Sequence, residues 1–325
     1  MRTVNFVQAI NEAMREEMER DPTVFVMGED VELGLMGATA GLVAQFGKDR
    51  VRNTPLAECS FVGAAVGAAA SGSRPIVDMM MWTFAYVAMD QFVNQAAKMT
   101  YMFGGQAKLP IVYRGLTGPF GAAAAQHSDG PHAMFMNVPG FKVVMPSTAA
   151  DAKGLLKSAI RDDNPVLFFE HAALMGAEGE VPEGEHLIPL GVADLKREGD
   201  HVTVVAIGPM VPQALAAAEE LAGEGISLEV VDPRTLVPLD EEVIRASVKK
   251  TGRLVVADDA PPICGAAAEI ATVVTEDDGT FGSLKAPIRR VTRSHVPVPY
   301  SPPMESFVIP GKEEIVAAVR EVMKW

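Results

Sequence analysis

The chain has 325 residues, of which 48% are hydrophobic and 22% charged, and 42 acidic against 28 basic side chains give a formal charge of −14 at pH 7. This charge disfavours nucleic acid and anionic membrane surfaces as partners. Because one core stops growing beyond roughly 250–300 residues, two packed domains are expected. No apolar run reaches the roughly 18 residues of a membrane span. Two distant cysteines fit a reducing compartment, so we expect a cytoplasmic protein without membrane contact.

In chain order, the first part of the sequence alternates helical and strand patterns. A helix is expected from Thr3 to about residue 21, because apolar side chains recur at helical spacing after a residue that can cap it. Further helices are expected near 42–46, from 61, over 85–101 and over 148–160. Strands are expected over 24–27, 75–79, 110–113, 141–145 and 166–169. This alternation indicates an α/β domain with a doubly wound, mostly parallel sheet.

The second part repeats the α/β pattern after a break. Residues 176–200 are rich in Gly, Glu and Pro without a sustained period, which indicates a linker with room for one hairpin. Strands are then expected over 202–207, 227–231, 254–257 and 288–292, with helices over 212–222, 241–250, 266–275 and 312–323. The sequence thus predicts one domain of residues 1–178, a linker of residues 179–199 and a second domain of residues 200–325.

Glycines in the chain do not form a nucleotide fingerprint. Gly63 and Gly67 lie in a helical pattern without the Gly-x-Gly-x-x-Gly spacing, and the turn after residue 207 holds only Gly208. No phosphate-binding Gly-x-x-x-x-Gly-Lys motif occurs, and neither His nor Cys clusters at metal-ligand spacing. Close helix–helix packing is therefore the better interpretation of Gly63 and Gly67.

Two titratable residues stand in unusual surroundings. Glu58 lies between a loop with Pro55 and a helix of small apolar residues, so it is either a helix cap or an acid whose pKa an apolar site raises. His127 follows a glycine- and alanine-rich stretch, and a histidine on such a loop suits proton transfer near neutral pH. The adjacent residues 127–129 cannot converge as a serine triad. Both residues are therefore candidates for catalysis, and a purely structural role stays open for each.

Many short segments, in the same order, resemble the β subunit of the thiamine-diphosphate-dependent dehydrogenase component of 2-oxo acid dehydrogenase complexes. The resemblance extends to acetoin dehydrogenase β subunits. The segments are Met27-Gly-Glu-Asp30, Thr54-Pro-Leu-Ala-Glu58, Arg74-Pro-Ile, Asp90-Gln91 with Asn94 and Ala96-Ala-Lys98, Gln126-His-Ser128, Asp151-Ala-Lys-Gly154, Asp162-Asp-Asn-Pro165, Asp232-Pro-Arg-Thr-Leu236 and Pro297-Val-Pro-Tyr-Ser-Pro302.

The resemblance implies a pyrimidine-binding thiamine diphosphate domain followed by a transketolase C-terminal-like domain. It implies an oxidoreductase that cleaves a 2-oxo acid or acetoin at the carbonyl and transfers the acyl group to a lipoyl group. No Gly-Asp-Gly motif occurs in the chain, so the resemblance assigns Mg²⁺ to an α subunit in an α2β2 heterotetramer. The further partner is a lipoyl-bearing dihydrolipoyl acyltransferase. The surplus of 29 Gly and 18 Met fits a large interface with that α subunit.

Site residues follow from the resemblance position by position. Glu58 matches the glutamate that hydrogen-bonds the aminopyrimidine ring nitrogen and so favours the tautomer that deprotonates the thiazolium carbon. A mostly apolar wall is expected around it, because an exposed Glu is rarely protonated at neutral pH. Leu56 and Phe84 match residues beside the pyrimidine, Glu29 matches a residue near the active-site channel, and His127 matches the histidine that assists acyl transfer.

A structural potassium ion is also implied by the resemblance. It would be held by backbone oxygens of Ile111, Ala159, Ile160, Asp162 and Asn164. A helix ending near residue 160 leaves carbonyls free at its negative end, which suits a cation.

Some residues depart from the family pattern. Asp129 and His132 add a charge and a second histidine beside His127, which keeps open the alternative of a non-catalytic scaffold subunit. Residues 102–105 and 177–184 are closer to acetoin-type members. The substrate stays open between pyruvate, branched-chain 2-oxo acids and acetoin.

Overall fold

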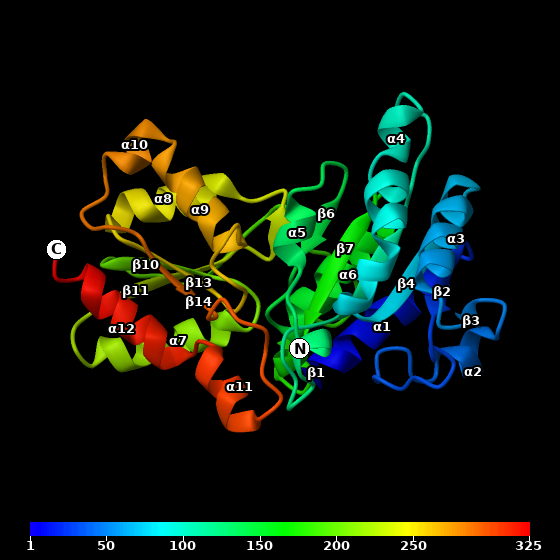
Figure 1. Ribbon diagram of the computed structural model, residues 1–325, viewed down its shortest axis with the longest axis horizontal. Coiled ribbons are helices and arrows are strands. Elements are labelled where there is room, and N and C mark those ends of the chain that lie inside the picture. The colour runs from blue at the N-terminus through cyan, green and yellow to red at the C-terminus, as the bar shows by residue number, and fades with distance from the viewer. The chain divides into compact units, whose positions relative to one another are not determined.

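The computed structural model describes residues 1–325, which form two compact units (Figure 1). The first unit comprises Met1–Thr117 and Met134–Leu190, and the second comprises Gly118–Ala133 and Gly191–Trp325. None of the helices is long and apolar enough to cross a membrane.

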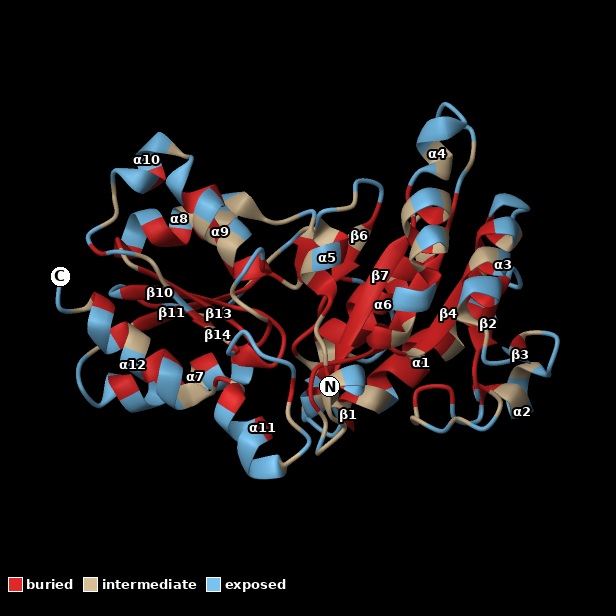
Figure 2. Ribbon diagram, viewed as in Figure 1, coloured by how far each residue is buried: buried red, intermediate tan, exposed pale blue.

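The first unit is built on a parallel sheet with strand order β6-β7-β5-β4-β2-β3. Its strands are β2 (Val24–Gly28), β3 (Val51–Asn53), β4 (Arg74–Met81), β5 (Val112–Thr117), β6 (Lys142–Val144) and β7 (Val166–His171). Every residue of β2, β5 and β7 is buried, as expected of parallel strands covered on both faces (Figure 2). The doubly wound α/β prediction for this part is confirmed.

The helices of this unit cover the sheet. They are α1 (Phe6–Arg20), α2 (Leu42–Phe46), α3 (Glu58–Ala70), α4 (Met99–Met102), α5 (His132–Met136), which spans the border of the two units, and α6 (Ala149–Arg161). Helix α1 begins after Asn5, whose side chain accepts from the Gln8 backbone N–H in a capping box. The expected cap at Thr3 was wrong, because Thr3 lies in β1 (Arg2–Asn5) and pairs with Glu180 of β8 (Glu178–Val181).

The single helix expected over 85–101 is divided. The chain forms the 3₁₀ turn η1 (Trp82–Ala88) and the π-helical segment η2 (Gln91–Ala96) before α4. Trp82 is fully buried, stacks on Phe169 with ring centroids 4.1 Å apart, and donates from its indole nitrogen to the Phe168 carbonyl at 3.1 Å. These contacts fix the start of the segment against β7. π-Segments recur at functional sites, and sequence periodicity does not reveal them.

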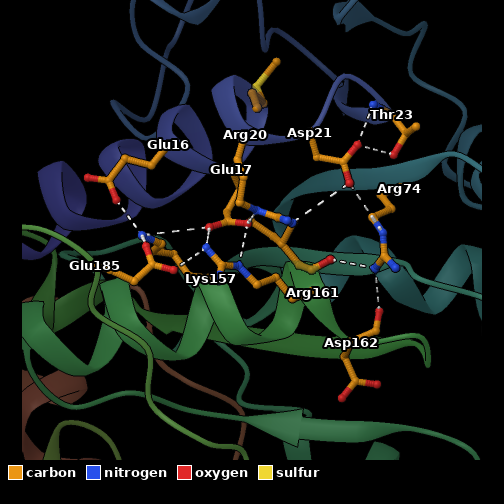
Figure 3. A network of polar contacts seen from close by, with 12 residues as sticks. Glu16, Glu17, Arg20, Asp21, Thr23, Arg74, Lys157, Arg161, Asp162 and Glu185 are labelled. Carbon is orange, nitrogen blue, oxygen red and sulfur yellow. Dashed lines mark hydrogen bonds and ion pairs between the residues drawn. The ribbon is translucent and has the colours of Figure 1, made fainter.

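Helices α1 and α6 are joined by a network of ion pairs (Figure 3). The Arg161 guanidinium donates two hydrogen bonds, of 2.9 and 2.6 Å, to the fully buried Glu17 carboxylate, and Arg20 donates a third. Lys157 binds both Glu16 and Glu185, at 2.7 and 2.8 Å. The network balances the buried Glu17 charge, because a buried carboxylate is costly unless it is paired.

The second unit contains a mixed sheet with strand order β14-β13-β10-β11-β9. Strands β10 (Val202–Ala206), β11 (Leu228–Asp232), β13 (Leu254–Asp258) and β14 (Arg289–Thr292) are parallel, and β9 (Asp194–Arg197) is antiparallel to β11. The remaining elements are η3 (Ala125–His127), β12 (Thr235–Val237), α7 (Met210–Ala222), α8 (Glu241–Thr251), α9 (Ala266–Thr275), α10 (Asp278–Phe281), α11 (Pro302–Val308) and α12 (Lys312–Val322). The expected second α/β unit is present.

The borders of the units differ from the expected domains 1–178 and 200–325 with a linker between. Residues 118–133 belong to the second unit, although they lie within the expected first domain. The segment 179–199 is divided between two sheets, because β8 pairs with β1 while β9 pairs with β11. It therefore forms no hairpin of its own.

Candidate active site

Charged side chains meet at the carboxyl ends of the parallel strands of the first unit, where ligands bind in open α/β sheets. Gly28 ends β2 with φ of 155°. A Cβ there would lie 2.4 Å from the Asp78 carbonyl oxygen, so only glycine allows β2 to pass so close to β4. This approach places Glu29, the next residue, within electrostatic range of Asp78.

Glu29 is a buried carboxyl without a cationic partner. Its side chain is 7% exposed, and its Oε1 has no hydrogen-bond partner within the protein. Burial, followed by the negative charges of Glu58, Asp30 and Asp78, raises its pKa to about 7. A carboxyl in this range can hold or release a proton at neutral pH.

Three charged residues form ion pairs between the neighbouring strands β4, β5 and β7. Arg114 of β5 is 1% exposed and binds Glu170 of β7 and Asp78 of β4. Burial raises the pKa of Glu170, and the Arg114 guanidinium opposes that rise. Because Arg114 is engaged by two carboxylates, it does not neutralise Glu29.

Sequence reasoning missed these three residues. A signal was present, because Asp78, Arg114 and Glu170 each interrupt a strand that is otherwise largely apolar. A buried charge in such a strand requires an opposite charge nearby.

Glu58 is the first residue of α3. The N-cap is Ala57, which caps with no side-chain hydrogen bond, so Glu58 is not the cap of the helix. It is half-buried, and the neighbouring Leu56 is 84% exposed. The apolar wall expected around Glu58 is therefore incomplete within this chain, because the surface beside it is open.

Apolar side chains gather on that open surface. The Cys59 thiol contacts the Val87 carbonyl at 2.6 Å, which joins the start of α3 to η1. Tyr86 and Val87 of η1 are 40% and 61% exposed. The expected residue beside the pyrimidine, Phe84, lies on the same turn and is half-buried. An open apolar surface of this kind is typical of an interaction site.

The packing predicted for Gly63 and Gly67 is confirmed for one of the two. A Cβ at Gly63 would lie 2.6 Å from Gln91 Oε1, so this glycine lets α3 approach η2. Gly67 faces open space, with no atom within 4 Å of an added Cβ. The packing prediction for Gly67 was wrong, because no other element of the chain covers this part of α3.

His127 belongs to the second unit, whereas Glu29 and Glu58 belong to the first. It ends the 3₁₀ turn η3 and is exposed, while the next residue, Ser128, is fully buried. Ala122 and Ala124 before it have φ of 62° and 60°. Left-handed backbone is unfavourable for alanine and occurs preferentially at functional sites.

The carbonyls expected to hold potassium lie in the first unit near the end of α6. One Arg74 nitrogen lies 3.1 Å from both the Ile160 and the Asp162 carbonyl oxygens, so these two oxygens converge on one point. The Ala159 carbonyl accepts from the Asp162 N–H at 3.2 Å, and the Ile111 carbonyl accepts from Val166 at 2.8 Å. Asn164 donates to the Asp162 side chain. The convergence fits a cation, and Arg74 already supplies one.

Comparison with known families matches both parts of the chain. The family described as "Transketolase, pyrimidine binding domain" matches residues 2–177, and "Transketolase, C-terminal domain" matches residues 191–315. A solved structure described as "Split gene transketolase, inactive beta4 tetramer" superposes with a TM-score of 0.82 at 25% identity, and covers 97% of both chains.

Curated relatives cover almost the whole chain. The acetoin:2,6-dichlorophenolindophenol oxidoreductase subunit beta of Cupriavidus necator is 49% identical over 99% of this chain and 98% of its own. The pyruvate dehydrogenase E1 component subunit beta of Rickettsia felis is 47% identical over 97% of both chains. The 2-oxoisovalerate dehydrogenase subunit beta of Bacillus subtilis is 44% identical over the full length of both. The chain therefore belongs to the β subunits of thiamine-diphosphate-dependent 2-oxo acid and acetoin dehydrogenases, a family of oxidoreductases.

Proposed function

We propose that this chain, with an α subunit, oxidatively cleaves acetoin at the carbonyl and transfers the acyl group to the lipoyl group of an acyltransferase. The buried Glu29 beside Glu58 carries the proposal, because two acids at a sheet edge suit proton transfer at a bound cofactor. The acetoin oxidoreductase β subunit of Cupriavidus necator, at 49% identity against 47% for the pyruvate dehydrogenase subunit of Rickettsia felis, supports acetoin as the substrate.

The residues present fit thiamine diphosphate at its pyrimidine end. Glu29 Oε1 is a buried acceptor without a partner in the protein, and Leu56 and Phe84 offer apolar contacts beside Glu58. In this proposal Glu58 holds a proton at the pyrimidine ring nitrogen, and Glu29 exchanges protons near neutral pH. Thiamine diphosphate, when bound, supplies the carbon nucleophile that attacks the substrate carbonyl. His127 assists acyl transfer to the lipoyl group.

The proposed assembly is an α2β2 heterotetramer in the cytoplasm. The open apolar surface at Leu56, Tyr86 and Val87 supports a partner chain beside Glu58. The chain has no Gly-Asp-Gly motif, which supports an α subunit as the holder of Mg²⁺ and the diphosphate. Two exposed free cysteines, Cys59 and Cys264, support a reducing compartment.

A potassium ion is proposed at the carbonyls of Ile111, Ala159, Ile160, Asp162 and Asn164. Support comes from the convergence of two of them on one Arg74 nitrogen. Each carbonyl has a second lone pair, so the ion and the guanidinium can share the Ile160 and Asp162 oxygens.

The test is co-expression of the chain with its α subunit and assay of 2,6-dichlorophenolindophenol reduction with thiamine diphosphate. Acetoin, pyruvate and 2-oxoisovalerate are compared side by side. We expect the highest kcat/KM with acetoin and no turnover by the β chain alone. Higher kcat/KM with either 2-oxo acid contradicts the substrate, and turnover without a second polypeptide contradicts the assembly. Absence of turnover in the complex with all three favours the scaffold alternative.

A further inference from the structure

The loop that carries His127 adopts a strained path. Gly118 and Gly121 have φ of 77° and 69°, and Ala122 and Ala124 have φ of 62° and 60°. Glycine tolerates these angles, but alanine adopts them at a cost in free energy because of its Cβ. Contacts elsewhere in the unit must therefore hold the loop in this path.

Arg293 contacts the two residues that follow His127. It follows β14, is 2% exposed, and its backbone N–H donates to the Ala260 carbonyl at 3.1 Å. Its Nη1 donates to the Ser128 carbonyl at 3.2 Å, and its Nη2 donates to the Asp129 carboxylate at 3.1 Å. One buried guanidinium thus binds the two residues that directly follow His127.

The loop is closed and tied at further points within the same unit. The Gly118 N–H donates to the Asp129 carbonyl at 3.2 Å, which joins the start of the loop to its end. The Ala122 N–H donates to the Glu305 carboxylate of α11 at 2.9 Å. His127 itself stays exposed between these fixed neighbours. The restraints therefore hold the loop on both sides of His127, whose side chain is exposed.

The surroundings of Arg293 are otherwise acidic. His132, which is fully buried, lies with Nε2 3.3 Å from the Asp258 carboxylate, and Asp259 and Arg293 act on the same imidazole. Asp129 is paired with Arg293, and Asp258 with His132. Loss of the guanidinium would leave the Asp129 carboxylate without this cation, two residues from the imidazole of His127.

We propose that Arg293 is a positioning residue for His127: it fixes the backbone after His127 and neutralises Asp129, so that the imidazole meets the acyl acceptor in one orientation. The proposal rests on the acyl-transfer role proposed for His127. It also gives a purpose to Asp129, which departs from the family pattern.

The variants separate charge, geometry and general damage. Arg293→Met removes the guanidinium but keeps an unbranched side chain, and Arg293→Lys keeps the charge without the planar, two-point geometry. Asp129→Asn keeps the size and leaves the Ser128 contact in place. Arg289→Met is the matched control, because it breaks the exposed Arg289–Glu321 pair at the start of the same strand.

Each variant is prepared as the α/β complex and studied in three ways. Hydrogen exchange is followed for peptides within residues 119–131, acyl transfer to lipoamide is measured as kcat and KM, and dichlorophenolindophenol reduction is measured separately. For Arg293→Met we expect exchange at least about tenfold faster, and kcat for acyl transfer about tenfold lower with KM changed less.

The conservative variants and the control sharpen the result. Arg293→Lys restores part of kcat, Asp129→Asn accelerates exchange, and Arg289→Met matches the wild type in every measurement. Unchanged exchange in Arg293→Met overturns the proposal, and so does faster exchange with unchanged kcat. Unchanged acyl transfer in His127→Ala would show that His127 has no role in this step. Hydrogen exchange in Arg293→Met tests the loop contacts separately, so the two failures can be told apart.

Discussion

Glu29 is buried beside Glu58, and the negative charge of Glu58 adds to burial in raising the pKa of Glu29 to about 7. Neither Arg114 nor another cation relieves this repulsion, because Arg114 is bound by Asp78 and Glu170. Such a pair is unfavourable for folding when both carboxyls are ionised. It is useful when a proton must be held at neutral pH.

The raised pKa of Glu29 makes stability depend on pH. A carboxyl whose pKa is higher in the folded than in the unfolded chain stabilises the protein below its unfolded value of about 4.3, and this stabilisation is lost as the pH rises through about 7. We therefore expect the gain in the free energy of unfolding of Glu29→Gln over the wild type to be about 1–2 kcal/mol larger at pH 8 than at pH 5. Urea titrations of the β chain at both pH values measure this difference.

Asp200→Asn, at an exposed carboxyl, is the control and should show no such difference. The same gain for Glu29→Gln at both pH values would disprove the ionisation assigned to Glu29.

Glu17 is the fully buried carboxylate of the network between α1 and α6. Glu17→Gln leaves Arg161 and Lys157 without its charge in a buried position, so we expect a loss of about 3 kcal/mol in the free energy of unfolding. Glu224→Gln breaks an exposed pair with Arg320 and should leave the free energy of unfolding almost unchanged. Equal losses in the two variants, measured in urea, would rule out a special role for the buried charge.

We expect His132 to make the stability of the second unit fall as the pH rises. Burial lowers the pKa of His132, and the charge of Arg293 lowers it further. The negative charges of Asp258 and Asp259 outweigh both effects, so the pKa is raised above its ordinary value. The stabilisation is therefore complete below about pH 6.5 and is lost as the pH rises through the raised pKa. Exchange of residues 119–131 should accelerate over that interval in the wild type, after correction for the intrinsic rate, and not in His132→Gln. The same pH dependence in both proteins would exclude His132 as the cause.

The potassium proposal predicts a cation-specific effect. KCl should raise the Tm of the β chain by about 2–4 °C, roughly 1 kcal/mol for a domain of this size, relative to NaCl at equal ionic strength. Charge screening would make the two salts equivalent. Equal Tm values would leave Arg74 as the cation at these carbonyls.

The sequence predicted the buried parallel strands well, because short apolar runs between turn residues are typical of such strands. It failed where the chain uses irregular winding or non-local contacts. No periodicity signals the π-segment at Gln91–Ala96, and no local pattern assigns residues 118–133 to the second unit, because Arg293 and Asp258 hold them from far along the chain.

Among the site residues, too, those with a local sequence pattern were predicted and those that depend on non-local contacts were not. Glu58 and His127 were expected from the family pattern. Pairing of Asp78, Arg114 and Glu170 depends on strand order, which places β4 and β7 on either side of β5. A large interface with an α subunit was expected, but its place at Leu56 was not predicted, because exposure depends on the tertiary structure.

The central claim is that Glu58 holds the proton on which cofactor chemistry depends, and the most direct measurement is turnover of acetoin by the α/β complex with Glu58→Gln. The account predicts a loss of at least about 100-fold in kcat, with the assembly unchanged in gel filtration, because the amide keeps the size but cannot exchange the proton. Glu183→Gln, at an exposed carboxyl, is the matched control and should retain wild-type turnover. Turnover of Glu58→Gln within a factor of two of the wild type would contradict the account.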